Sequence, residues 1–108
     1  MGFGGSVGIT EEVWDKRRDI LQIAARHHAT DVRLIGSVAR GEARPASDVD
    51  LVVRFLPTAT SLSHDAMVEE LEGLLGRKVE VIREDALRAS TRSRLLNEAV
   101  ALSEDRQR

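Results

Sequence analysis

Residues 36–51, Gly-Ser-Val-Ala-Arg-Gly-Glu-Ala-Arg-Pro-Ala-Ser-Asp-Val-Asp-Leu, constrain the fold more than any other segment of the chain. The preceding residues 31–35 form a short run with β-branched side chains, which predicts a strand that enters a tight turn at Gly36. Gly36 has no Cβ, so a ligand can approach its backbone closely. If a short helix begins at Ser37, its free amide groups and the Ser37 hydroxyl face one point and form an anion site. The segment therefore predicts a strand followed by a phosphate-binding turn.

Three further residues, Arg40, Gly41 and Ser47, extend the motif from this turn to the next strand. Arg40 lies three residues after Ser37 and would share a helix face with it, which adds a cation for phosphate. A solvated surface arginine is an equally good interpretation of Arg40. Gly41 suits the left-handed residue that ends a single helical turn. Ser47 stands directly before the next strand and completes the candidate nucleotide-binding set.

The next predicted strand, residues 48–53, begins with two acids. Alternation places Asp48 and Asp50 on one face and Val49, Leu51 and Val53 on the other. Two carboxylates this close repel unless a hard divalent cation neutralises them, and magnesium takes carboxylates together with substrate phosphate oxygens. An isolated Ser-Asp-x-Asp is more often turn chemistry, but the Gly-Ser turn before it and the apolar strand after it favour a metal site.

A third acid lies in a later apolar segment, residues 77–82. Glu80 stands between Val79 and Val81 and therefore faces the opposite side from both. Periodicity leaves two interpretations open. Glu80 is either an edge-strand charge that discourages aggregation or a third ligand that converges on the same metal as Asp48 and Asp50.

These residues resemble the nucleotidyltransferase superfamily headed by DNA polymerase beta. The similarity is strongest to the minimal nucleotidyltransferase (MNT) domain, the antitoxin half of HEPN/MNT toxin–antitoxin pairs. That family has a strand, Gly-Ser, a short helix, Asp-x-Asp on the second strand and a third acid on a later strand. The pattern matches Gly36, Ser37, Asp48, Asp50 and Glu80, except that the third acid is usually aspartate.

The resemblance implies an antitoxin that transfers AMP from ATP to a tyrosine hydroxyl of a HEPN ribonuclease toxin. It implies one or two Mg²⁺ ions held by the catalytic acids, Asp48, Asp50 and Glu80. It also implies a nucleotide-binding set of Gly36, Ser37, Arg40 and Ser47, and a hetero-oligomer with the toxin. The alternative is an antitoxin that binds and masks its partner with weak catalysis or none. Glutamate in place of aspartate at position 80 motivates this second interpretation.

At 108 residues the chain has room for one domain. We expect a flexible lead at 1–9, a single minimal nucleotidyltransferase domain at 10–102 and a polar tail at 103–108. The predicted order is helix, strand, short helix, strand, helix, strand, helix, which indicates an α+β (α/β sandwich) fold. Its small mixed sheet would carry helices on one face, in a nucleotidyltransferase-like core.

The helix ends are also predicted from sequence. Thr10 caps a first helix that runs to about residue 29, and Ser61 or Ser63 caps a second that stops at Gly76. His64, at the start of the second helix, is expected to be solvated. The last helix carries apolar or small residues at four-residue steps and ends near residue 100; the steps are Leu87, Thr91, Leu95 and Ala99.

Composition limits the possible partners. The net charge is −2 and only three residues are aromatic, Phe3, Trp14 and Phe55, so we expect no direct nucleic-acid binding. There is no cysteine and no apolar run as long as a membrane span, which favours a cytoplasmic protein. The sheet face opposite the helices would leave Val52 and Ile82 uncovered, which favours oligomerisation or a protein partner.

Overall fold

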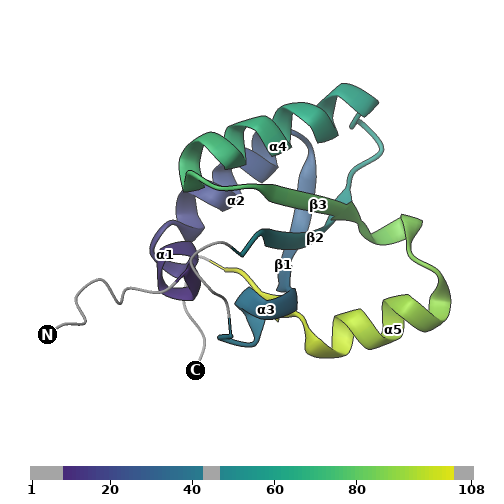
Figure 1. The fold of residues 1–108 in the computed structure, drawn as a ribbon. Helices are drawn as coiled ribbons and strands as arrows, with labels where there is room; N and C mark the ends of the chain where they lie inside the picture. Colours follow the sequence, from purple (N-terminus) through teal and green to yellow (C-terminus); the bar gives the residue numbers. More distant parts are fainter. Residues whose placement is uncertain (1–8, 43–46, 104–108) are drawn as a thin grey trace, which may run out of the picture.

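The computed structural model describes residues 9–42 and 47–103. The expected lead and tail therefore lie, except for Ile9 and Ser103, outside the described residues. In chain order the elements are α1 (Ile9–Asp15), α2 (Arg17–Arg26), β1 (Ala29–Ile35), α3 (Gly36–Ala39), β2 (Val49–Phe55), α4 (Ser61–Leu75), β3 (Val79–Arg83), the 3₁₀ turn η2 (Glu84–Ala86), α5 (Ala89–Glu98) and β4 (Val100–Ala101) (Figure 1). No helix among these elements is long and apolar enough to cross a membrane.

The four strands form one mixed sheet in the order β3-β2-β1-β4. Strands β2 and β3 are parallel and are joined by α4, because a parallel pair needs a crossover rather than a hairpin. Strand β1 is antiparallel to both β2 and β4. Helices α2 and α4 pack together on one face of the sheet (Figure 1). The predicted α+β fold with a small mixed sheet is confirmed, and β4 is an addition that the sequence did not indicate.

The main core lies between this face of the sheet and helices α2 and α4. In β2 the side chains of Val49, Leu51 and Val53 are fully buried, as their alternation with the acids predicts. Helix α4 contributes its predicted stripe, with Met67 and Leu71 fully buried. This packing fixes the direction of every side chain on β2, so the residues between the buried ones must point to the opposite face.

The first predicted helix is wrong in length and continuity. It is interrupted at Lys16, whose backbone takes φ −100° and ψ 14°, and it ends at Arg26 because Ala29 already begins β1. The ammonium group of Lys16 donates to the carbonyl of Leu74 on α4 at 3.1 Å, so the break is anchored to the neighbouring helix. Thr10 lies within α1 and is not its N-cap.

Helix α4 is capped at its N-terminus by a residue other than the two serines that we proposed, whereas its C-terminal end is as predicted. Thr60 is the N-cap, and its backbone N–H donates to Oγ of Ser63 at 3.0 Å, so Ser63 acts in the cap without being the capping residue. The helix stops at Gly76, which takes φ +67° as predicted. Ser61, one of the two serines proposed as the cap, is instead the first residue of the helix, and the cap lies one residue earlier.

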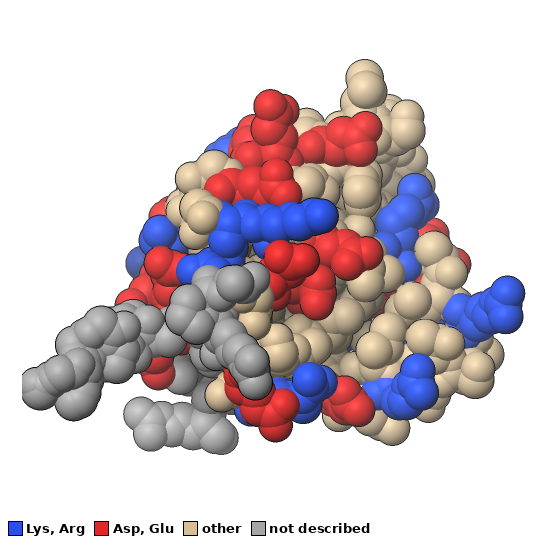
Figure 2. Space-filling model, viewed as in Figure 1, with Lys and Arg blue, Asp and Glu red and all other residues tan. Residues whose placement is uncertain are grey.

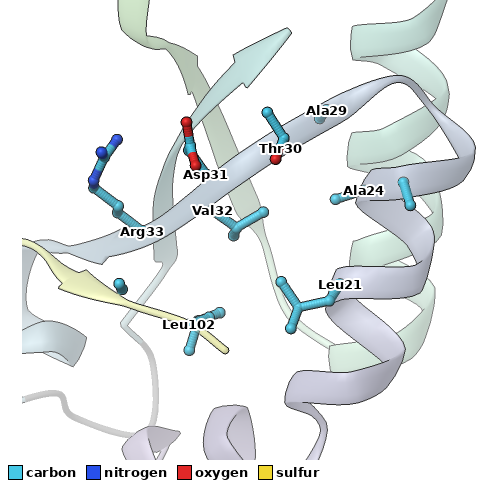
Figure 3. Close-up of a pocket in the computed structure, with 10 residues that line it drawn as sticks. Leu21, Ala24, Ala29, Thr30, Asp31, Val32, Arg33 and Leu102 are labelled. Carbon is cyan, nitrogen blue, oxygen red and sulfur yellow. The ribbon is translucent and has the colours of Figure 1, made fainter. Parts of the chain in front are cut away.

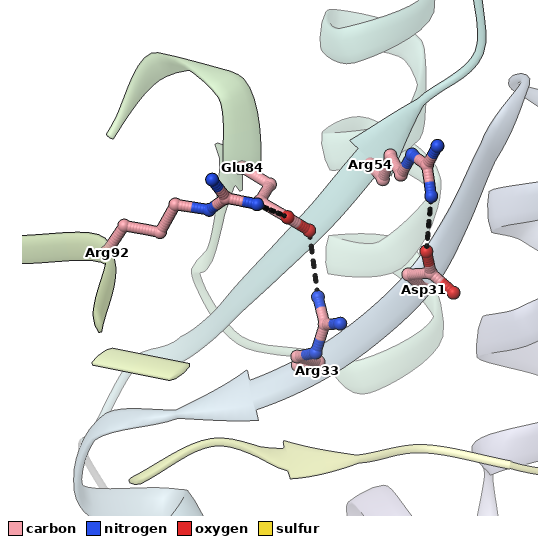
Figure 4. Close-up of polar contacts among 5 residues, drawn as sticks. All are labelled: Asp31, Arg33, Arg54, Glu84 and Arg92. Carbon is pink, nitrogen blue, oxygen red and sulfur yellow. Dashed lines mark hydrogen bonds and ion pairs between the residues drawn. The ribbon is translucent and has the colours of Figure 1, made fainter. Parts of the chain in front are cut away.

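The second face of the sheet is not left open. Val52, expected to be uncovered, is fully buried, and Ile82 is half-buried. The segment after β3 folds back beside this face through η2 and α5 (Figure 4). Helix α5 buries no residue completely and runs from Ala89 to Glu98, so Leu87 precedes it and the chain then enters β4. The predicted four-residue stripe is therefore only half-buried.

A glutamate bridges two arginines over this second face. Oε1 of Glu84 lies 2.9 Å from Nη1 of Arg33 on β1, and Oε2 lies 2.6 Å from Nη2 of Arg92 on α5 (Figure 4). The hydrogen bond from Arg92 and then that from Arg33 hold the pKa of Glu84 below its ordinary value of 4.5. Both Arg33 and Arg92 are thus paired. The bridge ties α5 to the sheet where apolar contact is incomplete.

We expect Glu84→Gln to lower the free energy of unfolding at pH 7 by about 1–2 kcal/mol, because two arginines lose a charged partner whose side chain is only 13% exposed. A folded-state pKa below the unfolded one gives stability that is present above pH 4.5 and is lost as pH falls through the folded pKa. Urea unfolding should therefore show a smaller difference in the free energy of unfolding between wild type and Glu84→Gln at pH 4 than at pH 7. Asp85→Asn is the control, since the Asp85 side chain is 72% exposed and its loss should cost under about 0.5 kcal/mol.

Candidate active site

The sheet register brings two of the predicted acids side by side. Asp50 on β2 is the direct partner of Glu80 on β3, and adjacent strands lie about 4.8 Å apart. Asp48 immediately precedes β2 and is exposed, whereas Asp50 is half-buried. Figure 2 shows acidic side chains gathered on the molecular face above β2 and β3. Of the two interpretations of Glu80, its position next to Asp50 favours convergence with the aspartates.

The electrostatics of Asp50 reflect this grouping. Its pKa is raised above the ordinary 3.8, first by burial, then by the negative charge of Glu80 and then by that of Asp48. Each of these effects disfavours the ionised carboxylate. The three acids therefore face a common region, and their mutual repulsion opposes full ionisation in the absence of a counter-ion.

Gly36 brings the backbone against Asp50. It takes φ +76°, and a Cβ built on it would lie 3.0 Å from Oδ2 of Asp50. Helix α3 begins at Gly36, one residue earlier than predicted, and Gly41 follows it with φ +73°, as expected for a left-handed stop. Ser37 lies in the first turn of α3 and is half-buried. The predicted turn thus lies directly beside the acids.

The other two predicted nucleotide ligands lie near the ends of the undescribed residues 43–46. The guanidinium of Arg40 is shared between two carboxylates: Nε lies 3.0 Å from Oε1 of Glu42, and Nη1 lies 3.8 Å from Oε1 of Glu98. Ser47 is half-buried, and its carbonyl accepts a hydrogen bond from Nη1 of Arg77 at 3.3 Å. Arg40 is therefore paired with acidic side chains and is not a free cation in this structure.

The donor set suits a hard divalent cation, because it consists of three carboxylates beside a glycine turn. Within residues 9–42 and 47–103, however, no three histidine, aspartate or glutamate side chains are arranged closely enough to hold an ion as they stand. The residues fit a cation in kind, and the register places two of them, Asp50 and Glu80, side by side.

Comparison with known proteins decides the family. Residues 16–102 match the nucleotidyltransferase domain family, and this range contains the turn, the Asp-x-Asp strand and Glu80. The chain belongs to that family. A solved minimal nucleotidyltransferase, described as a candidate member, superimposes with a TM-score of 0.79 at 44% identity and covers 84% of this chain and 93% of its own. The nucleotidyltransferase fold predicted from the motif is thus confirmed.

Two relatives extend the comparison. A candidate protein adenylyltransferase of Methanocaldococcus jannaschii is 33% identical over 84 residues, which cover 78% of this chain and 90% of the relative. The protein adenylyltransferase MntA of Thermococcus cleftensis is 32% identical over 79 residues, covering 73% and 80%. A toxin–antitoxin complex solved with AMP-PNP shares the fold at 15% identity, with a TM-score of 0.70 and coverage of 83% and 74%.

Two residues beside the candidate acids were not predicted as site residues from sequence. His64 on α4 and Lys78 before β3 line a groove of about 400 Å³ together with Asp48 and Glu80. Nε2 of His64 lies 2.7 Å from the carbonyl oxygen of Val81, so the expectation of a solvated histidine is wrong. The strand–helix–strand order could have indicated this contact, because a helix that joins two parallel strands packs beside the second strand.

Another hollow, of about 360 Å³, lies away from the nucleotidyltransferase acids. It is formed by α2, β1 and β4, and Figure 3 shows Leu21, Val32 and Leu102 pointing into it, with Asp31 and Arg33 at its rim. None of the acids or turn residues predicted for the site lines it. Its arginine, Arg33, is paired with Glu84 at 2.9 Å, so the groove beside β3 remains the candidate active site.

The raised pKa of Asp50 predicts how the stability of the cation-free protein depends on pH. An acid whose folded-state pKa is raised destabilises the fold increasingly as pH rises from its unfolded value through its folded value. We therefore expect metal-free Asp50→Asn to gain stability relative to wild type as pH rises from 4 to 7, with a melting temperature a few degrees higher at pH 7. Thermal unfolding in EDTA across this range measures the gain. A constant difference at all pH values would contradict the raised pKa.

Proposed function

We propose that this chain is an antitoxin that transfers AMP from ATP to a tyrosine hydroxyl of a HEPN ribonuclease toxin and so silences it. The observation that carries the proposal is the pairing of Asp50 with Glu80 beside Asp48 and the Gly36 turn. Relatives above 30% identity that bear the name protein adenylyltransferase support this chemistry. The toxin–antitoxin complex with the same fold supports the kind of partner.

In this proposal Asp48, Asp50 and Glu80 hold one or two Mg²⁺ ions. The cation would offset the charge of the triphosphate and of the departing pyrophosphate. The amide groups of the turn at Gly36 and Ser37 orient the phosphates, and the side chains of Arg40 and Ser47 complete the nucleotide-binding set. For Arg40 this role requires release from Glu42 and Glu98.

The transfer step forms one bond and breaks one. The tyrosine oxygen bonds to the α-phosphorus of ATP, and the bond from that phosphorus to the bridging oxygen of pyrophosphate breaks in line with it. The hydroxyl proton passes to a carboxylate of the site, for which exposed Glu80 is placed at the edge of the sheet. AMP remains on the tyrosine and pyrophosphate leaves with both electrons of the broken bond.

The proposal is tested by incubating the purified protein with ATP, Mg²⁺ and a purified HEPN ribonuclease toxin, taken from the neighbouring reading frame if that frame encodes one. The partner's intact mass should rise by one AMP unit or by whole multiples of it, and fragmentation should place the adduct on tyrosine. Absence of any adduct, or an adduct on a residue other than tyrosine, would refute the corresponding part of the proposal. A partner variant with the modified tyrosine replaced by phenylalanine is the control.

A masking antitoxin without catalysis is the second candidate. Helix α5 favours it, because none of its residues is fully buried and its leucines Leu95 and Leu96 are half-buried. Leu62, at the start of α4, is 74% exposed and adds to the apolar surface. This candidate predicts that a folded variant lacking Asp48 and Asp50 still protects cells from the toxin, whereas the adenylylation proposal predicts loss of protection.

A further inference from the structure

Strand β3 carries Glu80 at an edge of the sheet, so the ladder with β2 holds only one side of this strand. The Val49 N–H donates to the carbonyl of Lys78 at 3.0 Å, and Val49 pairs with Val79. In a parallel ladder, residues whose backbone groups face the partner strand alternate with residues whose groups face away. The N–H and C=O groups of Val79 and Val81 therefore point outward, away from β2.

Two side chains of α4 bond to these outward groups. The Val79 N–H donates to Oε2 of Glu72 at 3.1 Å, and Nε2 of His64 donates to the carbonyl of Val81 at 2.7 Å. A carbonyl only accepts, so the hydrogen of the imidazole must be on Nε2. The His64 ring also lies 6.2 Å from the ring of Phe55, centroid to centroid, which restricts its orientation. The edge strand is thus held on its outer side at two points.

Glu80 is the residue between these two points. Its side chain is exposed, and among the described residues no hydrogen bond or ion pair to its carboxylate is found. The position of that carboxylate therefore depends on the backbone of β3 rather than on contacts of its own. A glutamate has one more rotatable bond than an aspartate, so an unfixed backbone would spread its carboxylate over a larger volume.

We propose that His64 and Glu72 are positioning residues for the third acid: by fixing the outer edge of β3 on both sides of Glu80, they hold its carboxylate opposite Asp50. This inference rests on the proposed function, because it assigns the two residues to the cation site of that function. Supporting partners of metal ligands commonly change affinity by 10–100-fold when removed. His64→Ala and Glu72→Ala are expected to weaken cation binding about 10-fold.

The test is a Mn²⁺ titration followed by the free-ion electron paramagnetic resonance signal, without nucleotide or partner. His64→Gln keeps a donor at the position of Nε2, and Glu72→Gln keeps an acceptor oxygen, so both should bind Mn²⁺ within about threefold of wild type. Glu70→Ala is the matched control on the same helix. Glu70 bonds Arg26 at 2.6 Å and His27 at 3.1 Å, away from β3, so its loss should leave Mn²⁺ affinity unchanged.

The outcomes separate the two proposals. If wild type binds Mn²⁺ through Asp48 and Asp50 but both alanine variants bind it within twofold of wild type, the positioning role is refuted and adenylyl transfer stands. Weakening by Glu70→Ala to the same extent would also refute it, because the effect would then be one of helix stability. If wild type binds no Mn²⁺ through the aspartates, the positioning role falls, whereas adenylyl transfer is decided separately by the mass of the partner, because Mg²⁺ also takes phosphate oxygens of the nucleotide. If an alanine variant does not fold, the Mn²⁺ affinities of the glutamine variants are compared with that of Glu70→Ala. A tenfold loss of affinity in both glutamine variants would refute the positioning role.

Discussion

The double variant Asp48→Asn, Asp50→Asn is expected to lose AMP transfer by at least about 10³-fold while remaining folded. Asparagine keeps the size of each side chain but removes the charge that would hold a divalent cation. The raised pKa of Asp50 means that its ionised carboxylate destabilises the folded state. The cation-free variant should therefore melt no lower than wild type. Partner mass spectrometry measures the first effect, and thermal unfolding in EDTA measures the second.

Asp31→Asn is the control for this variant. Asp31 lies on the same sheet and is exposed, its carboxylate pairs with Nη1 of Arg54 at 3.3 Å, and its φ of +52° suits asparagine. It should retain full transfer activity. Transfer by the double variant at more than about a tenth of the wild-type rate would exclude a catalytic role for the two aspartates. A double variant that is inactive and unfolded would show that they serve the fold, contrary to their repulsion.

The second large effect is expected from Gly36→Ala, which should reduce AMP transfer about 10²-fold and lower stability by about 1–2 kcal/mol. The stability cost comes from placing a side chain at φ +76°, where an L-residue is strained. The activity cost has another cause. The new Cβ would lie 3.0 Å from Oδ2 of Asp50, so the carboxylate must move from its place beside Glu80.

Gly76→Ala separates these two causes. Gly76 has a similar φ of +67°, but a Cβ there meets no atom within 4 Å. It should therefore show a comparable loss of stability with unchanged transfer. Single-turnover rates at saturating ATP and Mg²⁺, together with urea unfolding, compare the two variants. Equal activity in both would mean that the approach of Gly36 to Asp50 has no catalytic consequence.

Much of the fold follows from local pattern. The apolar stripe of α4, its glycine stop and the alternation in β2 are read directly from spacing, because each periodic face is buried against one neighbour. The two-residue strand β4 could not be found this way, since two residues carry no period. The break at Lys16 depends on a carbonyl of α4 that lies 58 residues away, so no local signal marks it.

The candidate site also contains residues that a local motif predicts and residues that only long-range pairing places. The turn at Gly36 and the acids on β2 are contiguous in sequence, so a motif describes them, and their closeness follows from the strand alone. Glu80 is different, because periodicity places it on a face without indicating which strand it neighbours. That depends on β3 lying parallel to β2 in a register that sets Glu80 against Asp50. His64 was misjudged for the same reason, as its partner is a backbone group of β3.

The parallel pairing of β2 and β3 also has a kinetic consequence. Asp50 and Glu80 stand 30 positions apart and become neighbours only after the whole α4 crossover has closed, a non-local contact of the kind that slows folding. This closure brings like charges together, so it is the step most opposed by electrostatics. A divalent cation that binds the closed pair but not the unfolded chain would stabilise the native state in proportion to its concentration. Such a cation would then stabilise the fold in addition to the role that we propose for it in transfer.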